Sequence, residues 1–144
     1  MNTTTLRSFG ASLFFAAGSA FALTAGTPAP DFAVADSHGK PVRLADYKGK
    51  FVVLEWTNPE CPFVRAQYGA TTMQALQKEA AGRDVVWLAV NSTNQSSSEY
   101  KSGAQMNAWM QDHKGAAKAV LIDANSATGR AYDAKTTPHM FVID

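Results

Sequence analysis

Four short apolar runs, separated by longer polar segments, constrain the fold of this chain most strongly. Residues 51–56 (FVVLEW) form a nearly continuous apolar run, which is typical of a strand buried on both faces of a parallel sheet. Similar runs follow at residues 85–90, 119–122 and 140–143. Because the segments between them have helical character, the order predicts an α/β fold with a mostly parallel central sheet flanked by helices.

The segment after the first run predicts the start of a helix. Asn58 is a strong N-cap residue, and Pro59 suits the first helical position. We expect a helix from there to about Ala81, with a kink or break near Gly69.

The remaining elements follow from periodicity and turn residues. Met106, Trp109 and Met110 recur at helical spacing, which predicts a helix packed on the core. The other expected elements are a hairpin of residues 31–35 and 42–44, a polar surface loop over 91–101, a helix over 103–114 and a short helix over 127–134.

The first residues resemble an export signal. Arg7 precedes an apolar run over 9–23, and Ala20-Phe21-Ala22 fits an A-x-A cleavage site. A membrane anchor or a core helix is the alternative, but the run is shorter than the ~20 apolar residues that span a bilayer. We therefore expect a signal peptide over 1–22, a domain over 23–144, a periplasmic or secreted location, and no stable membrane association after cleavage.

Length and charge limit the function classes. The 144 residues fit one domain, and 13 basic against 12 acidic residues give a net charge of +1. Since no basic stripe is present, a nucleic-acid partner is not expected.

Cys61 is the one cysteine, so the chain can form no internal disulfide. It follows a buried strand and falls in the first turn of the expected helix, where the partial positive charge of the helix end stabilises a thiolate. Glu60 opposes this effect and Arg65, one turn later, assists it. The alternative is a buried thiol without chemistry.

Residues 53–65 (VLEWTNPECPFVR) resemble the active-site strand–helix junction of the thioredoxin-like superfamily, and within it the peroxiredoxin-like (redoxin, AhpC/TSA-type) family. Residues 30–32 (PDF), 39–42 (GKPV) and 47–50 (YKGK) are similar to the N-terminal hairpin of that family, and residues 137–138 before 141–144 (FVID) to its cis-proline segment. The resemblance implies a thioredoxin-like fold, a reactive Cys61, and a cis Pro138 that with Thr137 holds a substrate or partner beside the sulfur. His139 could help to tune the thiolate or could face elsewhere.

The sequence departs from the family at two positions. Val64 occupies the place of the second cysteine of thioredoxins, which excludes a dithiol mechanism within this chain. Asn58 stands where peroxiredoxins have Thr or Ser, so the expected role of Asn58 and Arg65 is only to help stabilise charge at the sulfur. The resemblance also implies a further strand and helix beyond the cis-proline strand, so we expect a fold that lacks its last strand and helix, and a C-terminally truncated domain.

These observations leave three functions open. The first is a thiol-dependent peroxidase, an antioxidant in which Cys61 reduces a peroxide and an external thiol reductant restores it. The second is a thiol-disulfide oxidoreductase that forms mixed disulfides with partners. The third is a binding module of the same fold with weak catalysis. No cofactor is expected, and His38 and His113 lack partners at metal-ligand spacing.

Overall fold

The computed structural model describes residues 23–144, and the expected signal peptide lies outside this range. A four-stranded mixed sheet has the order β5-β4-β3-β6, and a separate two-stranded hairpin pairs β1 with β2. The elements are β1 (Ala33–Ala35), β2 (Pro41–Arg43), the 3-10 helix η1 (Leu44–Tyr47), β3 (Val52–Trp56), α1 (Pro62–Gly69), α2 (Thr72–Gly82), β4 (Val86–Asn91), α3 (Gly103–Asp112), β5 (Ala119–Ile122), α4 (Ala127–Ala131) and β6 (His139–Ile143).

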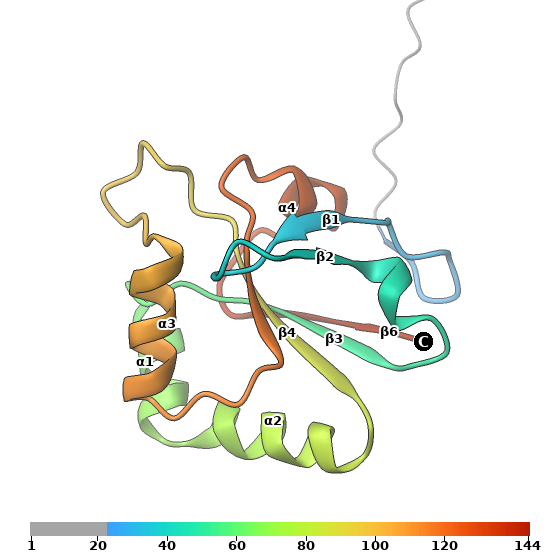
Figure 1. Ribbon diagram of the computed structural model, residues 1–144, viewed down its shortest axis with the longest axis horizontal. Helices are drawn as coiled ribbons and strands as arrows, with labels where there is room; N and C mark the ends of the chain where they lie inside the picture. The colour runs from blue at the N-terminus through green and yellow to red at the C-terminus, as the bar shows by residue number, and fades with distance from the viewer. Residues whose placement is uncertain (1–22) are drawn as a thin grey trace, which may run out of the picture.

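The sheet separates two apolar layers, and Figure 1 shows the elements that cover each face. Helices α1, α2 and α3 cover one face, and the β1–β2 hairpin with α4 covers the other. Successive residues of β3 alternate between the layers: Leu54 and Trp56 pack on the hairpin side, and Val53 packs on the helix side. The fully buried central strands confirm the expectation drawn from their apolar runs.

Strand directions confirm a mixed sheet. Strand β3 pairs in parallel with β4, and β4 with β5, while β6 runs antiparallel to β3. The parallel pairs place the carboxyl ends of β3 and β4 at one edge of the sheet, and β6 begins at the same edge, with His139 opposite Trp56. The loops at this edge carry the candidate site.

The long helix expected after β3 is two helices. Helix α1 ends at Gly69, Thr71 takes a left-handed φ of 60°, and α2 begins at Thr72. The break therefore lies near Gly69, as expected. Within residues 23–144, none of the helices has the length and apolar character needed to cross a bilayer.

Candidate redox site

The turn after β3 presents Cys61 at the start of α1. The carbonyl of Asn58 accepts a hydrogen bond from the Cys61 amide (3.0 Å), and its side-chain oxygen accepts one from the Glu60 amide (2.8 Å). Pro59 is thus the second residue of a tight turn. The predicted helix start at Asn58 and Pro59 is wrong: Cys61 is the N-cap and Pro62 the first helical residue.

A physical reason for this shift lies in the two prolines. Pro59 suits a turn that Asn58 opens, and a residue before proline avoids helical backbone. Cys61 precedes Pro62 and has the extended values φ −70° and ψ 122°. Cys61 therefore lies at the N-terminus of α1, and the helix begins about one turn later than predicted.

The surroundings of Cys61 favour its charged form. Burial by itself would raise the pKa of this half-buried thiol. A hydrogen bond of the Thr137 side chain, then the backbone amides of Val64 and Phe63 and the positive charge of Arg65, oppose that effect, and the resulting pKa lies below the ordinary value. The protonated sulfur makes no capping hydrogen bond, so we assign the amides to the stabilisation of the thiolate.

The cis-proline segment lies beside the sulfur. The Thr137–Pro138 peptide bond is cis, as the family resemblance implies. The Cys61 Sγ atom lies 3.0 Å from the carbonyl oxygen of Thr137. Because a carbonyl oxygen can only accept, this contact belongs to the protonated thiol, which donates its S–H.

Asn58 and Arg65 are near the cysteine, but their side chains have other partners. The Asn58 amide nitrogen donates to Thr93 Oγ1 (2.9 Å), so this side chain ties two loops together. The Arg65 guanidinium is 3.8 Å from Glu60 Oε2, and its side chain is more than half exposed. Arg65 is therefore placed to act on the thiol through its charge, whereas Asn58 belongs to the turn that precedes it.

The three histidines do not form a site with Cys61. His139 stacks at a tilt on Phe141, with ring centroids 4.5 Å apart, and Phe141 belongs to the hairpin-side layer. His38 lies by Asn107, and His113 stacks on Trp109. Among residues 23–144, no group of three or more potential metal ligands is present.

A buried carboxylate, which the sequence analysis did not single out, lies six residues before the cysteine. Glu55 is fully buried and accepts hydrogen bonds from Tyr68 Oη (3.0 Å), Trp87 Nε1 (2.7 Å) and Gln77 Nε2 (3.1 Å). Burial raises its pKa, although these three donors counteract part of the effect. The signal was present in the sequence as one acidic residue within an apolar strand.

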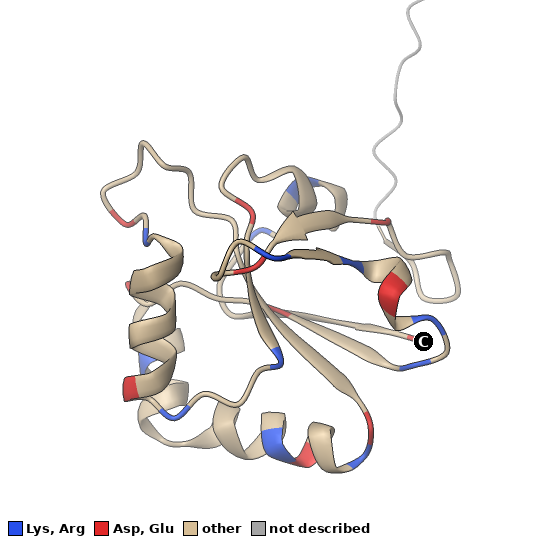
Figure 2. Ribbon diagram, viewed as in Figure 1, with Lys and Arg blue, Asp and Glu red and all other residues tan. Residues whose placement is uncertain are grey.

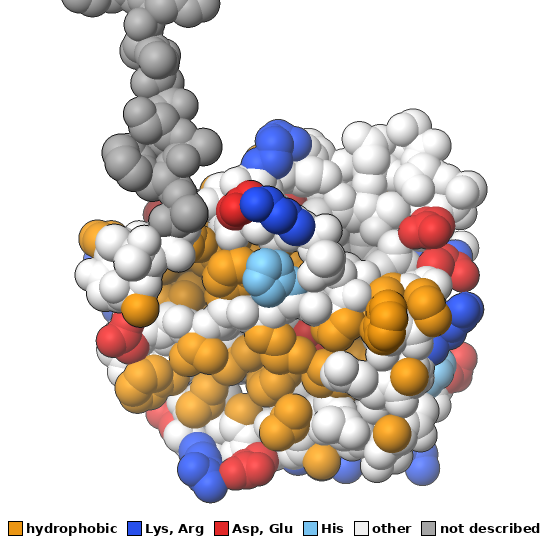
Figure 3. All heavy atoms as spheres, turned by 180° about the vertical axis from the view of Figure 1, so that it is seen from behind, with side chains coloured by type: hydrophobic (Ala, Val, Ile, Leu, Met, Phe, Trp, Pro, Cys, Tyr) orange, Lys and Arg blue, Asp and Glu red, His pale blue; other side chains and the backbone are white. Residues whose placement is uncertain are grey.

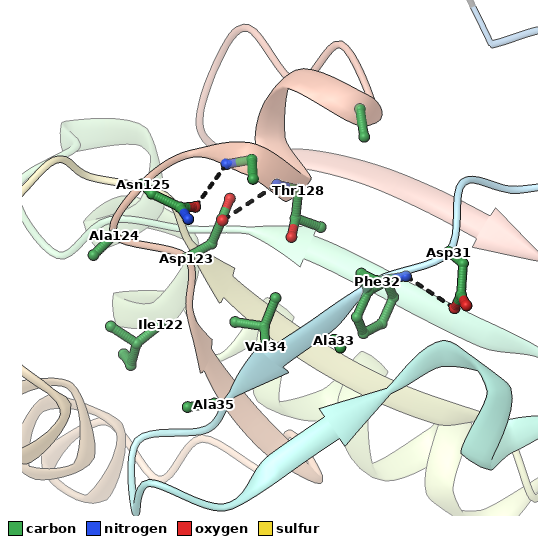
Figure 4. A pocket seen from close by; sticks show the side chains of 12 residues that line it. Asp31, Phe32, Ala33, Val34, Ala35, Ile122, Asp123, Ala124, Asn125 and Thr128 are labelled. Atoms are coloured by element: carbon green, nitrogen blue, oxygen red, sulfur yellow. Dashed lines mark hydrogen bonds between the residues drawn. The ribbon is translucent and has the colours of Figure 1, made fainter.

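Neither the distribution of charged residues nor the cavity described below extends the site around Cys61. Acidic and basic residues are interspersed along the ribbon in the view of Figure 2. A hollow of about 480 Å³ opens between β1 and the loop leading to α4, and Figure 4 shows Asp123 at its wall bonded to the amide of Thr128. Its lining residues do not include Cys61.

Comparison with known proteins identifies the relationship. A model of the AhpC/TSA family matches residues 25–144, which is nearly all of the described chain. The chain belongs to the AhpC/TSA family. No curated protein sequence matches it.

Solved structures similar to this AhpC/TSA-family chain share its thioredoxin-like fold. A hypothetical protein from Sinorhizobium meliloti has a TM-score of 0.75 and 26% identity, over 86% of this chain and 67% of that one. An uncharacterized conserved protein from Geobacillus kaustophilus has a TM-score of 0.74 and 26% identity, over 83% of this chain and 62% of that one. The exposed lipoprotein thioredoxin Etrx1 from Streptococcus pneumoniae has a TM-score of 0.62 and 30% identity, over 80% and 82% of the two chains.

These findings confirm the predicted family and fold. The family match and the similarity to an exposed lipoprotein thioredoxin support a thioredoxin-like redox function and oxidoreductase activity for this AhpC/TSA-family chain. They are consistent with thiol or disulfide substrates and a thiol reductant. The individual roles of Cys61, Asn58, Arg65, Thr137 and Pro138 stay predictions.

Proposed function

We propose that this chain is a single-cysteine thiol-disulfide oxidoreductase that acts through mixed disulfides. The Cys61 thiolate attacks one sulfur of a partner disulfide, a new S–S bond forms to Cys61, and the other partner sulfur leaves as a thiolate. Because Val64 replaces a second cysteine, an external thiol must attack the mixed disulfide to release Cys61.

The observation that carries this proposal is the place of the sulfur. Cys61 Sγ is half-buried at the amide end of α1, 3.0 Å from the Thr137 carbonyl of the cis-proline segment. Next to it, Phe63 exposes 71% of its surface, which offers an apolar contact for a polypeptide partner. A thiol with a lowered pKa also has a larger thiolate fraction at neutral pH, and the thiolate is the nucleophile.

Peroxide reduction, which the sequence analysis ranked first, is the second candidate and is favoured by the AhpC/TSA family match. In that reaction the thiolate attacks one peroxide oxygen, the O–O bond breaks, Cys61 becomes a sulfenic acid, and an alcohol or water leaves. The geometry ranks it lower because the Asn58 amide is bound to Thr93 and Arg65 pairs with Glu60. Both side chains therefore have partners other than a peroxide bound at the sulfur.

One comparison tests the two reactions. The reduced chain is mixed either with oxidised glutathione, a small disulfide, or with hydrogen peroxide. Mass spectrometry follows modification of Cys61, with Cys61→Ser as control. We expect the mixed disulfide to form faster than in the urea-unfolded chain, and faster than the sulfenic acid. A rate no faster than that of the unfolded chain contradicts the proposal, and faster sulfenic acid formation favours peroxide reduction.

Export belongs to the proposal as well. The expected signal over residues 1–22 fits a protein that meets disulfides in an oxidising compartment. Similarity to an exposed lipoprotein thioredoxin agrees with this location. Fusion of residues 1–22 to a reporter that is active only after export should yield activity, and a reporter retained in the cytoplasm would contradict it.

A further inference from the structure

Glu60, the residue before Cys61, forms ion pairs with two basic side chains, Lys101 and Arg65. Its Oε1 atom lies 2.6 Å from Lys101 Nζ, and its Oε2 atom lies 3.8 Å from Arg65 Nη1. Lys101 belongs to the polar segment after β4, immediately before Ser102, the N-cap of α3. The Lys101 side chain is about one quarter exposed, so this pair is held more firmly than a free surface pair.

Glu60 precedes Cys61 in the chain, and both are acted on by the charge of Arg65. The hydrogen bond and the positive charge of Lys101, followed by the charge of Arg65, lower the pKa of Glu60, so it is a carboxylate at neutral pH. The same carboxylate also competes with the thiolate for the one arginine that both face.

We propose that Lys101 is a positioning residue that holds the Glu60 carboxylate and thereby leaves the charge of Arg65 to the Cys61 thiolate. This inference rests on the proposed function, because it concerns how readily Cys61 ionises. The charged groups that face Glu60 are Lys101 from the loop before α3 and Arg65 from α1. The groups that act on the sulfur are the Thr137 side chain and carbonyl, the amides of α1 and Arg65.

A double-mutant cycle tests this role. The rate of Cys61 alkylation by iodoacetamide is measured against pH for the full chain, for Lys101→Met, for Glu60→Gln and for the double variant. We expect Lys101→Met to raise the apparent pKa of Cys61 by about half a unit, which lowers the rate at neutral pH about threefold. Glu60→Gln in the Lys101→Met background should restore the rate, and Lys101→Arg should keep it.

The outcomes separate the possible explanations. An unchanged pH profile in Lys101→Met overturns the inference, and so does a slow Lys101→Met variant that Glu60→Gln does not restore. If Lys101→Met fails to give the far-ultraviolet circular dichroism of the parent chain, Glu60→Gln alone decides, because it should lower the apparent pKa of Cys61. If Cys61 of the parent chain reacts no faster than in the unfolded chain, the proposed function itself fails.

Discussion

At the scale of single residues, a few neighbouring groups decide whether the Cys61 sulfur is charged. A hydrogen bond of the Thr137 side chain, the helix amides and Arg65 lower the pKa of Cys61 against the cost of its burial. Arg65 is a solvent-facing side chain, so its effect is modest and sensitive to salt. The charge on the sulfur is therefore adjustable by single substitutions that leave the fold intact.

Arg65→Gln should raise the pKa of Cys61 by roughly half a unit, since it removes a positive charge that acts on the thiol. Alkylation rates measured over a pH series report this shift directly. Arg83→Gln is the matched control, because Arg83 pairs with Glu79 on α2 and is not among the groups that act on the thiol. Equal profiles for the two variants would contradict a role of Arg65 at the sulfur.

The burial of Glu55 predicts how the free energy of unfolding depends on pH. Burial raises its pKa in the folded state, so the folded chain keeps this proton at pH values where the unfolded chain has lost it. The contribution of Glu55 is complete below the unfolded value, near 4.5, and is lost as the pH rises through the folded pKa.

Urea unfolding at several pH values measures the effect. The free energy of unfolding should decline by up to about 1.4 kcal/mol per pH unit across this window. In Glu55→Gln this decline should vanish, because the amide does not titrate. Equal slopes for the parent chain and the variant would show that another group binds the proton.

At the scale of elements, one buried carboxylate joins β4, β5 and α4. Asp123 follows β5 and accepts hydrogen bonds from Ser92 Oγ (2.6 Å) and from the amides of Thr128 (3.2 Å) and Gly129 (2.9 Å). These amides start α4, and Ser92 follows β4. Asp123 therefore ties the loops at the carboxyl edge of the sheet, where the redox site also lies.

Asp123→Ala should lower the free energy of unfolding by about 3 kcal/mol, because it leaves buried donors without partners. Asn125→Ala is the matched control: its side chain accepts one exposed hydrogen bond from the Ala127 amide. The control should lose less than about 1 kcal/mol in the same urea titration. Similar losses in both variants would contradict the joining role of Asp123.

The sequence predicts an element correctly where a single pattern indicates it, and misplaces an element where two patterns indicate different structures. The apolar runs predicted each strand of the main sheet, and residues 119–122 coincide with β5. Asn58 and Pro59 satisfy the rules for a helix start and for a turn equally well, and the second proline, Pro62, decides for the turn. The partners of Glu55 come from three different elements, which no local pattern reveals.

At the scale of the whole molecule, one face is markedly apolar. Figure 3 shows hydrophobic side chains gathered in a band across the side opposite to the view of Figure 1. The exposed large hydrophobic residues of the described chain include Met140 and Val142 of β6, which is an outer strand of the sheet. Such an apolar edge favours association between molecules.

Val142→Lys should therefore reduce self-association of the chain, measured by sedimentation velocity. Val142 exposes 72% of its surface, so the free energy of unfolding should change by less than about 1 kcal/mol. Ser98→Lys places the same charge in the exposed loop after β4 and serves as control. If both variants reduce association equally, net charge and not the β6 edge is the cause.

The ionisation of Cys61 tests the central claim most directly. Ultraviolet thiolate absorbance is followed against pH for the folded chain and for the same chain in urea, with Cys61→Ser subtracted from each. We expect a lower pKa for Cys61 in the folded chain than in the unfolded one. A folded value equal to or above the unfolded value would contradict the redox assignment.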